Sequence, residues 1–332
     1  MHLITAAAVV GALLLAIGGV GNPLLFAGAV PIAAFGWLVR PRLGKAPKTG
    51  VLEPQEAPTL YALVAEVADA LRTPSADLVV VDGEMNASWS EVGLRRRRVL
   101  TLGLPLLAAL TSQERVALVA HELAHGRNGD QQRGLFIGSA MSTLEEIYGV
   151  LLPGKSLLTF SSFGLLDRLA RLLMWLLAQP VKGLIVLELH LLLREQQRAE
   201  YLADSLAASV AGSEATVGLL EKLLLDKAIG ISVHRAAHGK LEPDALFGAI
   251  AEHVANLPPR ERERVRRVAD LERARLGVTH PPTAMRIRLI EERQPLPPKI
   301  DIDEADIDAE LRSERNRVAR DLVDGYRAAL YR

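Results

Sequence analysis

Two histidines and a glutamate near the middle of the chain have the spacing of a metal site. His121 and His125 are four residues apart in the run Val-Ala-His-Glu-Leu-Ala-His, and on a helix this spacing directs both imidazoles to one side. Such a pair can bind one Zn²⁺ at about 2.0–2.1 Å per ligand. Glu122 is offset by one residue and would lie beside the metal, where its carboxylate could take a proton from a zinc-activated water. The alternative is a surface helix with incidental histidines.

A zinc that catalyses a reaction needs a third protein ligand and an open position. The chain contains no cysteine, so every metal ligand must be His, Asp or Glu. Glu200 and Asp204 are four residues apart in an alanine-rich stretch, which favours close helix packing. Glu200 could ligate zinc, and Asp204 could accept an N–H from a ligand imidazole. The spacing alone does not decide between the two carboxylates, and an ordinary helix with exposed carboxylates is the alternative.

A small set of helices and strands is expected to position these side chains. Apolar residues three and four apart predict amphipathic helices, and short runs rich in valine and leucine predict strands. The expected elements are a helix over 56–72, strands over 77–82 and 99–102, and a helix from Thr111 or Ser112 to about Asn128. The expected fold class is therefore mainly α with a small β-sheet (α+β).

The first 40 residues predict a transmembrane helical hairpin. No charged residue occurs from Leu3 to Val39, and Gly21-Asn22-Pro23 interrupts this run with turn-forming residues. Each half approaches the roughly 20 residues that cross a bilayer. A cleaved signal peptide is the alternative, but it needs basic residues before the apolar run, where only His2 stands. By the positive-inside rule, the cytoplasm is the expected side of the four basic residues that follow: Arg40, Arg42, Lys45 and Lys48.

Four stretches together resemble a known family. They are Leu-Val-Val-Val-Asp-Gly-Glu-Met-Asn-Ala at 78–87, the His-Glu-Leu-Ala-His run with Asp130 five residues on, Glu200-Tyr-Leu-Ala-Asp204, and Thr279-His-Pro-Pro with Arg286-Ile287. Their order and spacing are similar to those of the gluzincin membrane metallopeptidases, which include the HtpX-like proteases and the CAAX prenyl proteases. The resemblance covers roughly 55–292. It implies a zincin-like domain and a zinc-dependent endopeptidase, with His121, His125 and Glu200 as ligands and Glu122 as general base.

The resemblance also suggests roles for residues outside the metal ligands. His280 could donate a hydrogen bond to the oxyanion of the tetrahedral intermediate, or it could be a capping residue before Pro281. Arg286 could pair with a carboxylate such as Asp204 or contact substrate. Asn86 and Ala87 could bind an extended substrate backbone. The expected loop after Asn86-Ala87 departs from the family pattern, because it carries Trp89 and the basic run Arg95–Arg98. That run is either a solvated loop or a contact for anionic lipid headgroups.

The expected division of the chain follows these signals. It comprises a transmembrane hairpin over 1–40, a linker over 41–55, a zinc metallopeptidase domain over 56–293 and a helical tail over 294–332. Within the domain, the apolar stretch of about 134–193 either crosses the membrane twice or lies at its surface, because Lys182, Glu188 and His190 interrupt it. The tail is expected to form one amphipathic helix, which docks on the domain or on a partner.

The sequence therefore predicts a zinc endopeptidase integral to the cell membrane, with its catalytic domain in the cytoplasm. Expected partners are protein or peptide substrates and the lipid bilayer; the equal count of 39 basic and 39 acidic residues argues against a nucleic-acid binder. Three rivals stay open: a catalytically silent membrane scaffold with the same fold, a prenyl-protein protease, and a soluble metallohydrolase with apolar targeting segments. The chain is short for the seven spans that the second rival would need. Substrate and oligomeric state cannot be read from the sequence.

Overall fold

The computed structural model divides the chain into two compact units. One unit comprises Met1–Leu43 with Gln132–Glu195, and the other comprises Gly44–Gln131 with Gln196–Arg332. The residues that the structure describes are 2–20, 22–38, 44–93, 95–127, 141, 144–152, 165–240, 242–271, 281–302 and 304–330. The second unit contains every residue predicted to form the metal site. His280, predicted as a hydrogen-bond donor to the oxyanion, lies outside the described part of the chain.

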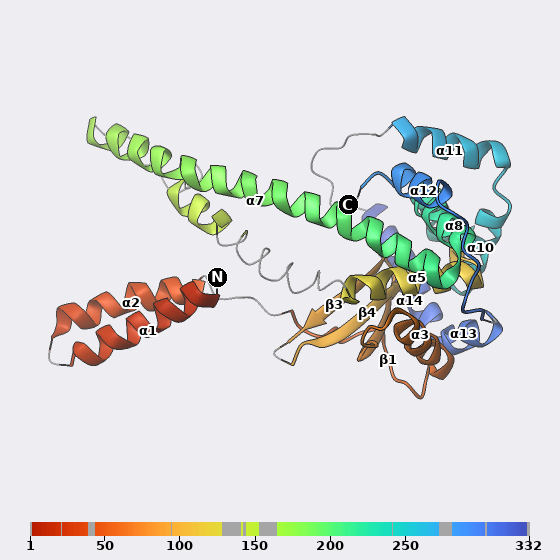
Figure 1. Ribbon diagram of the computed structural model, residues 1–332, viewed down its shortest axis with the longest axis horizontal. Coiled ribbons are helices and arrows are strands. Elements are labelled where there is room, and N and C mark those ends of the chain that lie inside the picture. The colour runs from red at the N-terminus through yellow and green to blue at the C-terminus, as the bar shows by residue number, and fades with distance from the viewer. Residues whose placement is uncertain are drawn as a thin grey trace. The chain divides into compact units, whose positions relative to one another are not determined.

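A four-stranded mixed sheet forms one layer of the second unit (Figure 1). Its spatial order is β1-β2-β4-β3, in which β2 and β4 are parallel and the other two pairs are antiparallel. The strands are β1 (Val51–Leu52), β2 (Leu78–Asp82), β3 (Ala87–Val92) and β4 (Arg97–Gly103). The strands predicted over 77–82 and 99–102 are confirmed as β2 and β4. The mainly helical α+β class is confirmed as well.

The loop expected after Asn86-Ala87 is a wrong prediction, because this stretch forms β3. Ala87 and Trp89 are buried while Ser88 between them is exposed, which is the alternation of a half-buried strand. Ala87 pairs with Leu102 of β4. Among the described residues, β3 pairs with no strand other than β4, so it is an edge strand of the sheet.

Two helices next to the sheet match their sequence predictions within about two residues. They are α3 (Pro58–Leu71) and α5 (Ser112–Arg127), and the short helix α4 (Leu104–Ala109) lies between β4 and α5. The inner face of α3 packs against α5, and α5 also packs against β3. This inner face contains Leu60, Leu63, Val64, Val67, Ala68 and Leu71, all buried. The helix α5 is thus held between the sheet and other helices.

The remaining helices of this unit form a layer that reaches α5 through α8. The end of the long helix α7 (Leu165–Ala211) belongs to it from Gln196 onward. Next, α8 packs on α5, α12 packs on α8, and α11 contacts α12. Their bounds are α8 (Ser213–Leu223), α9 (Asp226–Arg235), α10 (Leu246–Ala255), α11 (Pro259–Leu271) and α12 (Thr283–Glu291).

The C-terminal tail is part of this same unit. The amphipathic helix predicted in the tail is confirmed as α14 (Arg312–Leu330), and a shorter helix, α13 (Glu304–Glu310), precedes it. The chain turns between them at Leu311, whose side chain is buried in the core. The carboxylate of Glu310 accepts hydrogen bonds from the backbone N–H groups of Thr59 and Leu60, at 2.7 and 3.1 Å. Because these are unsatisfied donors in the first turn of α3, the tail caps that helix.

The other unit contains the apolar helices. The break predicted at Gly21-Asn22-Pro23 is confirmed, because α1 (His2–Gly18) ends before it and α2 (Pro23–Leu38) begins at its last residue. Both are shorter than 18 residues, and one helix in the described part of the chain, within Arg171–Ala211 of α7, is long and apolar enough to cross a membrane. Large apolar side chains are exposed along all three of these helices, which Figure 1 shows as ribbons. The hairpin's crossing of a membrane stays a prediction.

Candidate metal centre

The helix α5 is fixed at its start and buried along most of its length. Thr111 and Glu114 form a capping box, in which Thr111 N donates to Glu114 Oε2 at 2.8 Å and Glu114 N donates to Thr111 Oγ1 at 3.4 Å. Residues from Glu114 to Ala124 are buried. The sequence anticipates this start, since Thr-Ser-Gln-Glu has the capping-box spacing. The position of His121 and His125 is therefore set by a rigid core helix.

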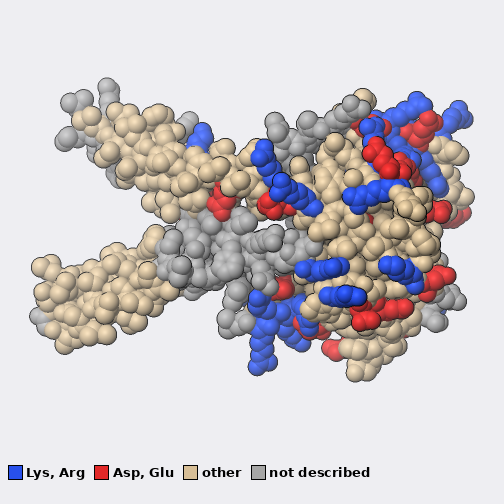
Figure 2. Space-filling model, in the orientation of Figure 1, with Lys and Arg blue, Asp and Glu red and all other residues tan. Residues whose placement is uncertain are grey.

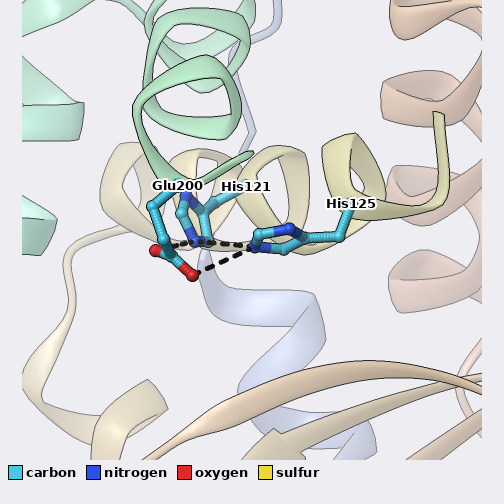
Figure 3. A group of neighbouring side chains, drawn as sticks. All are labelled: His121, His125 and Glu200. Atoms are coloured by element: carbon cyan, nitrogen blue, oxygen red, sulfur yellow. Dashed lines mark hydrogen bonds and ion pairs between the residues drawn. The ribbon is translucent and has the colours of Figure 1, made fainter. Parts of the chain in front are cut away.

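Three side chains from two helices converge at one point (Figure 3). His121 and His125 come from α5, and Glu200 comes from α7. His121 Nε2 lies 3.3 Å from His125 Nε2 and 3.5 Å from Glu200 Oε2. His125 Nε2 lies 3.6 Å from Glu200 Oε1. The structure thus brings together the three residues whose types and spacing suggested a metal site, and they could hold a metal ion.

These separations fit the size of a bound zinc ion. Ligand atoms arranged tetrahedrally at about 2.0–2.1 Å from a metal lie about 3.3–3.4 Å from one another. The two Nε2 atoms lie 3.3 Å apart. Different oxygens of the Glu200 carboxylate lie 3.5 Å from His121 Nε2 and 3.6 Å from His125 Nε2, and one donor atom from each of the three residues lies within 4.8 Å of the other two. Two imidazole nitrogens and one carboxylate oxygen are also a donor set found in catalytic zinc sites. His125 is half-buried, whereas His121 and Glu200 are buried.

A buried ion pair contacts the cluster of His121, His125 and Glu200. Arg286 of α12 binds Asp204 of α7 in a bidentate manner, with Nε to Oδ2 and Nη2 to Oδ1 both at 2.7 Å. Asp204 Oδ1 also lies 3.0 Å from His121 Nδ1. Asp204 is 1% exposed and Arg286 is 4% exposed, so this pair is shielded from water. Asp204 therefore lies where a partner that orients the His121 ring would be expected.

The electrostatics of the metal-free site favour a charged His121. Burial lowers the pKa of His121, but hydrogen bonds with Asp204 and Glu200 outweigh that effect and raise the pKa to about 9. Burial also opposes the charge on Arg286, yet its hydrogen bond with Asp204 leaves the pKa above the usual arginine value. Because a metal ligand must be a neutral imidazole, metal binding here releases a proton.

Glu122 lies next to the convergent ligands on the buried part of α5. Its negative charge contributes to the raised pKa of Arg286. Its role as a proton acceptor stays a prediction. Asn86 is exposed just before β3, and Ala87 is buried as its first residue. Gly103 N donates to Asn86 O at 2.9 Å, which joins that backbone to the end of β4.

Two contacts were missed at the sequence level. Arg286 Nη1 lies 3.2 Å from Glu200 Oε2, so the arginine contacts both carboxylates and not Asp204 alone. Gly126, directly after His125, packs against the ring of Trp89; a Cβ at Gly126 would lie 2.9 Å from ring atoms of Trp89. In the sequence, Ala87 and Trp89 alternate with serines. This alternation is the signal that could have predicted a strand with Trp89 on its buried face, against α5. No local pattern marks the Arg286–Glu200 contact.

Comparison with solved structures finds a weak likeness. The chain is similar to the crystal structure of S. mikatae Ste24p with a TM-score of 0.39 and 15% sequence identity, covering 88% of this chain and 67% of that chain. A TM-score of this size is too low to support a statement about fold or activity.

Comparison with protein families gives a match that spans most of the chain. The model of Peptidase family M48 matches residues 54–294. The matched region contains the whole sheet except β1, both histidines of α5, Glu200 and Arg286, and it ends where the tail begins. The buried cluster of two histidines and a glutamate agrees with this match. The chain therefore belongs to peptidase family M48 and is a metallopeptidase.

Proposed function

We propose that this protein is a zinc-dependent endopeptidase that cleaves protein substrates at the membrane, with His121, His125 and Glu200 as the zinc ligands. The observation that carries the proposal is the convergence of the three side chains: the two Nε2 atoms lie 3.3 Å apart, and each has an oxygen of the Glu200 carboxylate within 3.6 Å. Asp204 is assigned as an orienting residue and not as a ligand, because both its oxygens face Arg286 and its Oδ1 faces His121 Nδ1. Glu200 is the carboxylate that faces the two Nε2 atoms.

The side chains around the ligands have distinct tasks in peptide hydrolysis. Bound zinc would supply Lewis acidity, which polarises the scissile carbonyl and acidifies the attacking water. Glu122 accepts the proton of that water and passes it to the leaving amine. Asp204 holds the His121 ring so that its Nε2 faces the metal, and Arg286 keeps Asp204 ionised and in place. His280 is proposed, from the family resemblance, as a hydrogen-bond donor to the oxyanion.

Substrate binding is assigned to the edge strand β3. An extended peptide can add to the open edge of a sheet through backbone hydrogen bonds, and β3 is an edge strand that packs against α5. Ala87 begins this strand and Asn86 directly precedes it, and both are proposed to contact the substrate backbone. Backbone hydrogen bonds do not depend on the side chains of the substrate, so this mode of binding suits a peptidase with several protein substrates.

Membrane attachment is assigned to the apolar helices. The helices α1 and α2 carry no charged residue, and the apolar part of α7 is long enough to cross a bilayer. The basic residues after α2 assign the catalytic unit to the cytoplasm. The proposed substrates are therefore membrane proteins and cytoplasmic proteins that reach the membrane surface.

A substrate trap tests this proposal. Full-length Glu122→Gln, purified from cells with its bound proteins, should retain uncleaved substrates that the wild-type protein releases as fragments. The matched control is Glu66→Gln, which changes an exposed glutamate of α3. If mass spectrometry finds the same co-purifying proteins, equally fragmented, with both variants, the proteolytic function is wrong.

A further inference from the structure

A group of basic side chains surrounds the turn between β3 and β4. Figure 2 shows Lys and Arg side chains gathered there. The chain that arrives from α2 lies beside this turn, because Gly93 N donates to Gly44 O at 2.9 Å. We call the group the basic turn; it consists of Lys45, Arg95, Arg96, Arg97 and Arg98.

Only part of this charge is neutralised within the protein. Arg98 binds Asp77 through Nε and Nη2, at 2.9 and 2.6 Å, and this pair lowers the pKa of Asp77. Arg96 Nε donates to Glu91 at 2.7 Å. The other three cations of the basic turn are exposed, and within the described residues they form no ion pair: Lys45, Arg95 and Arg97. The turn therefore presents three cations to an external anion.

The connection to α2 indicates which anion is available. Five residues, 39–43, join the end of α2 to Gly44, and two of them are Arg40 and Arg42. Five extended residues span at most about 18 Å. A bilayer that holds α2 would therefore have its headgroups within reach of the basic turn. The attraction of an anionic bilayer for Lys and Arg acts within about one Debye length of its surface, roughly 10 Å at 0.1 M salt.

We propose that the basic turn binds the anionic headgroups of the bilayer that holds α1 and α2. This inference rests on the proposed membrane anchoring and specifies how the catalytic unit meets the surface. Because the turn directly follows Val92, the last residue of β3, its binding holds one end of the substrate strand at the headgroups. The segments best placed to add to β3 are then those that emerge from the same bilayer. The substrate class is juxtamembrane segments of membrane proteins.

A single fluorescent label can report this contact in the full-length protein. The chain has no cysteine, so Ala46→Cys, next to Lys45, can be labelled uniquely with bimane. The protein is reconstituted in vesicles of zwitterionic lipid or of zwitterionic lipid with 30% phosphatidylglycerol, each with a trace of lipid carrying a headgroup quencher. The test variant adds Arg95→Gln and Arg97→Gln. The matched control adds Arg260→Gln and Arg312→Gln, which are also exposed arginines.

We expect strong quenching in the anionic vesicles and little in the neutral ones, with loss of the difference at 1 M salt, where the Debye length is about 3 Å. Each basic residue near an anionic surface contributes about fivefold to binding. The test variant should therefore shift the equilibrium about 25-fold toward the detached state, and the control variant should behave like wild type. Equal quenching in both lipids, or an equal loss in the control variant, overturns the proposal.

Two further measurements separate other causes of failure. Extraction with alkaline carbonate tests the anchor by itself: protein that carbonate removes from the vesicles overturns both the anchoring and the inference, whereas retained protein with charge-independent quenching overturns the inference alone. Binding of a labelled single-stranded RNA tests whether the basic turn binds nucleic acid instead of lipid headgroups. If the RNA binds wild type and not the test variant, while quenching does not depend on lipid charge, the basic turn is a nucleic-acid surface and the proposal is wrong.

Discussion

Replacing Asp204 by asparagine should lower both the stability of the fold and the affinity for zinc. The amide keeps the shape of the side chain but removes the negative charge between Arg286 and His121. Arg286, whose side chain is 5% exposed, would lose its bidentate partner and keep only Glu200 Oε2 at 3.2 Å. Removing one partner of a buried ion pair destabilises a protein by about 3–5 kcal/mol. The freed arginine would also compete with zinc for Glu200.

The same change should weaken zinc binding. His121 would lose the carboxylate that lies 3.0 Å from its Nδ1, and loss of such a partner lowers metal affinity about 10–100-fold. Competition against a chromogenic chelator in detergent measures the affinity, and tryptophan fluorescence during heating measures the stability. Glu200→Ala, in contrast, should lose zinc altogether. If Asp204→Asn abolishes zinc binding while Glu200→Ala retains it, Asp204 is the zinc ligand and the assignment of Glu200 is wrong.

A double variant distinguishes the two effects. In Asp204→Asn/Arg286→Met, the unpaired buried charge is gone, and methionine fills much of the arginine's volume. We expect most of the lost stability to return, because removing both partners of a buried pair is often close to neutral. Zinc affinity should stay low, because His121 still lacks Asp204. Recovery of zinc affinity together with stability would refute the orienting role of Asp204. A double variant no more stable than Asp204→Asn would show that the unpaired charge of Arg286 is not the cause of the lost stability.

Three further predictions concern other parts of the protein. Gly126→Ala should destabilise the fold by about 1–3 kcal/mol by overpacking, since its Cβ would meet the Trp89 ring at 2.9 Å; Trp89→Phe in the same chain should recover part of this loss in a thermal unfolding assay. Glu310→Ala should cost about 0.5–2 kcal/mol, as for other lost helix caps, because it removes the acceptor for two N–H groups of α3; an unchanged unfolding midpoint would contradict the capping role. A reporter enzyme fused after Gly50 should report the cytoplasm, and an external signal would reverse the orientation.

Local signals in the sequence were sufficient for the metal-site helix. The Thr111–Glu114 capping box and the apolar residues after it define α5, and helical geometry places His121 and His125 on one side. The third ligand could be narrowed only to Glu200 or Asp204, because both lie on one face of the same helix. Which of them reaches the two Nε2 atoms depends on how α7 crosses α5, and that is a property of packing.

Contacts between distant segments account for what the sequence did not predict. Trp89 was placed in a loop because β3 lacks the run of valine and leucine that marks β2 and is defined by its pairing with β4. The tail was expected to dock somewhere, but the contact between Glu310 and the start of α3 joins residues about 250 positions apart. The same holds for Arg286, because its neighbours in the sequence do not indicate that it contacts both Glu200 and Asp204.

Zinc content and proteolysis, measured together on Glu122→Gln, test the proposed catalytic site most directly. Glutamine keeps the shape of Glu122 but cannot accept the proton, and the three proposed ligands are unchanged. We expect close to one zinc per chain by atomic absorption, with cleavage of casein in detergent reduced by at least the roughly 10²–10⁴-fold typical of lost general acid–base catalysis. His121→Ala should lose both zinc and activity. Full activity in Glu122→Gln, or loss of its zinc, would contradict the assignment of Glu122 as the general base beside a His121–His125–Glu200 site.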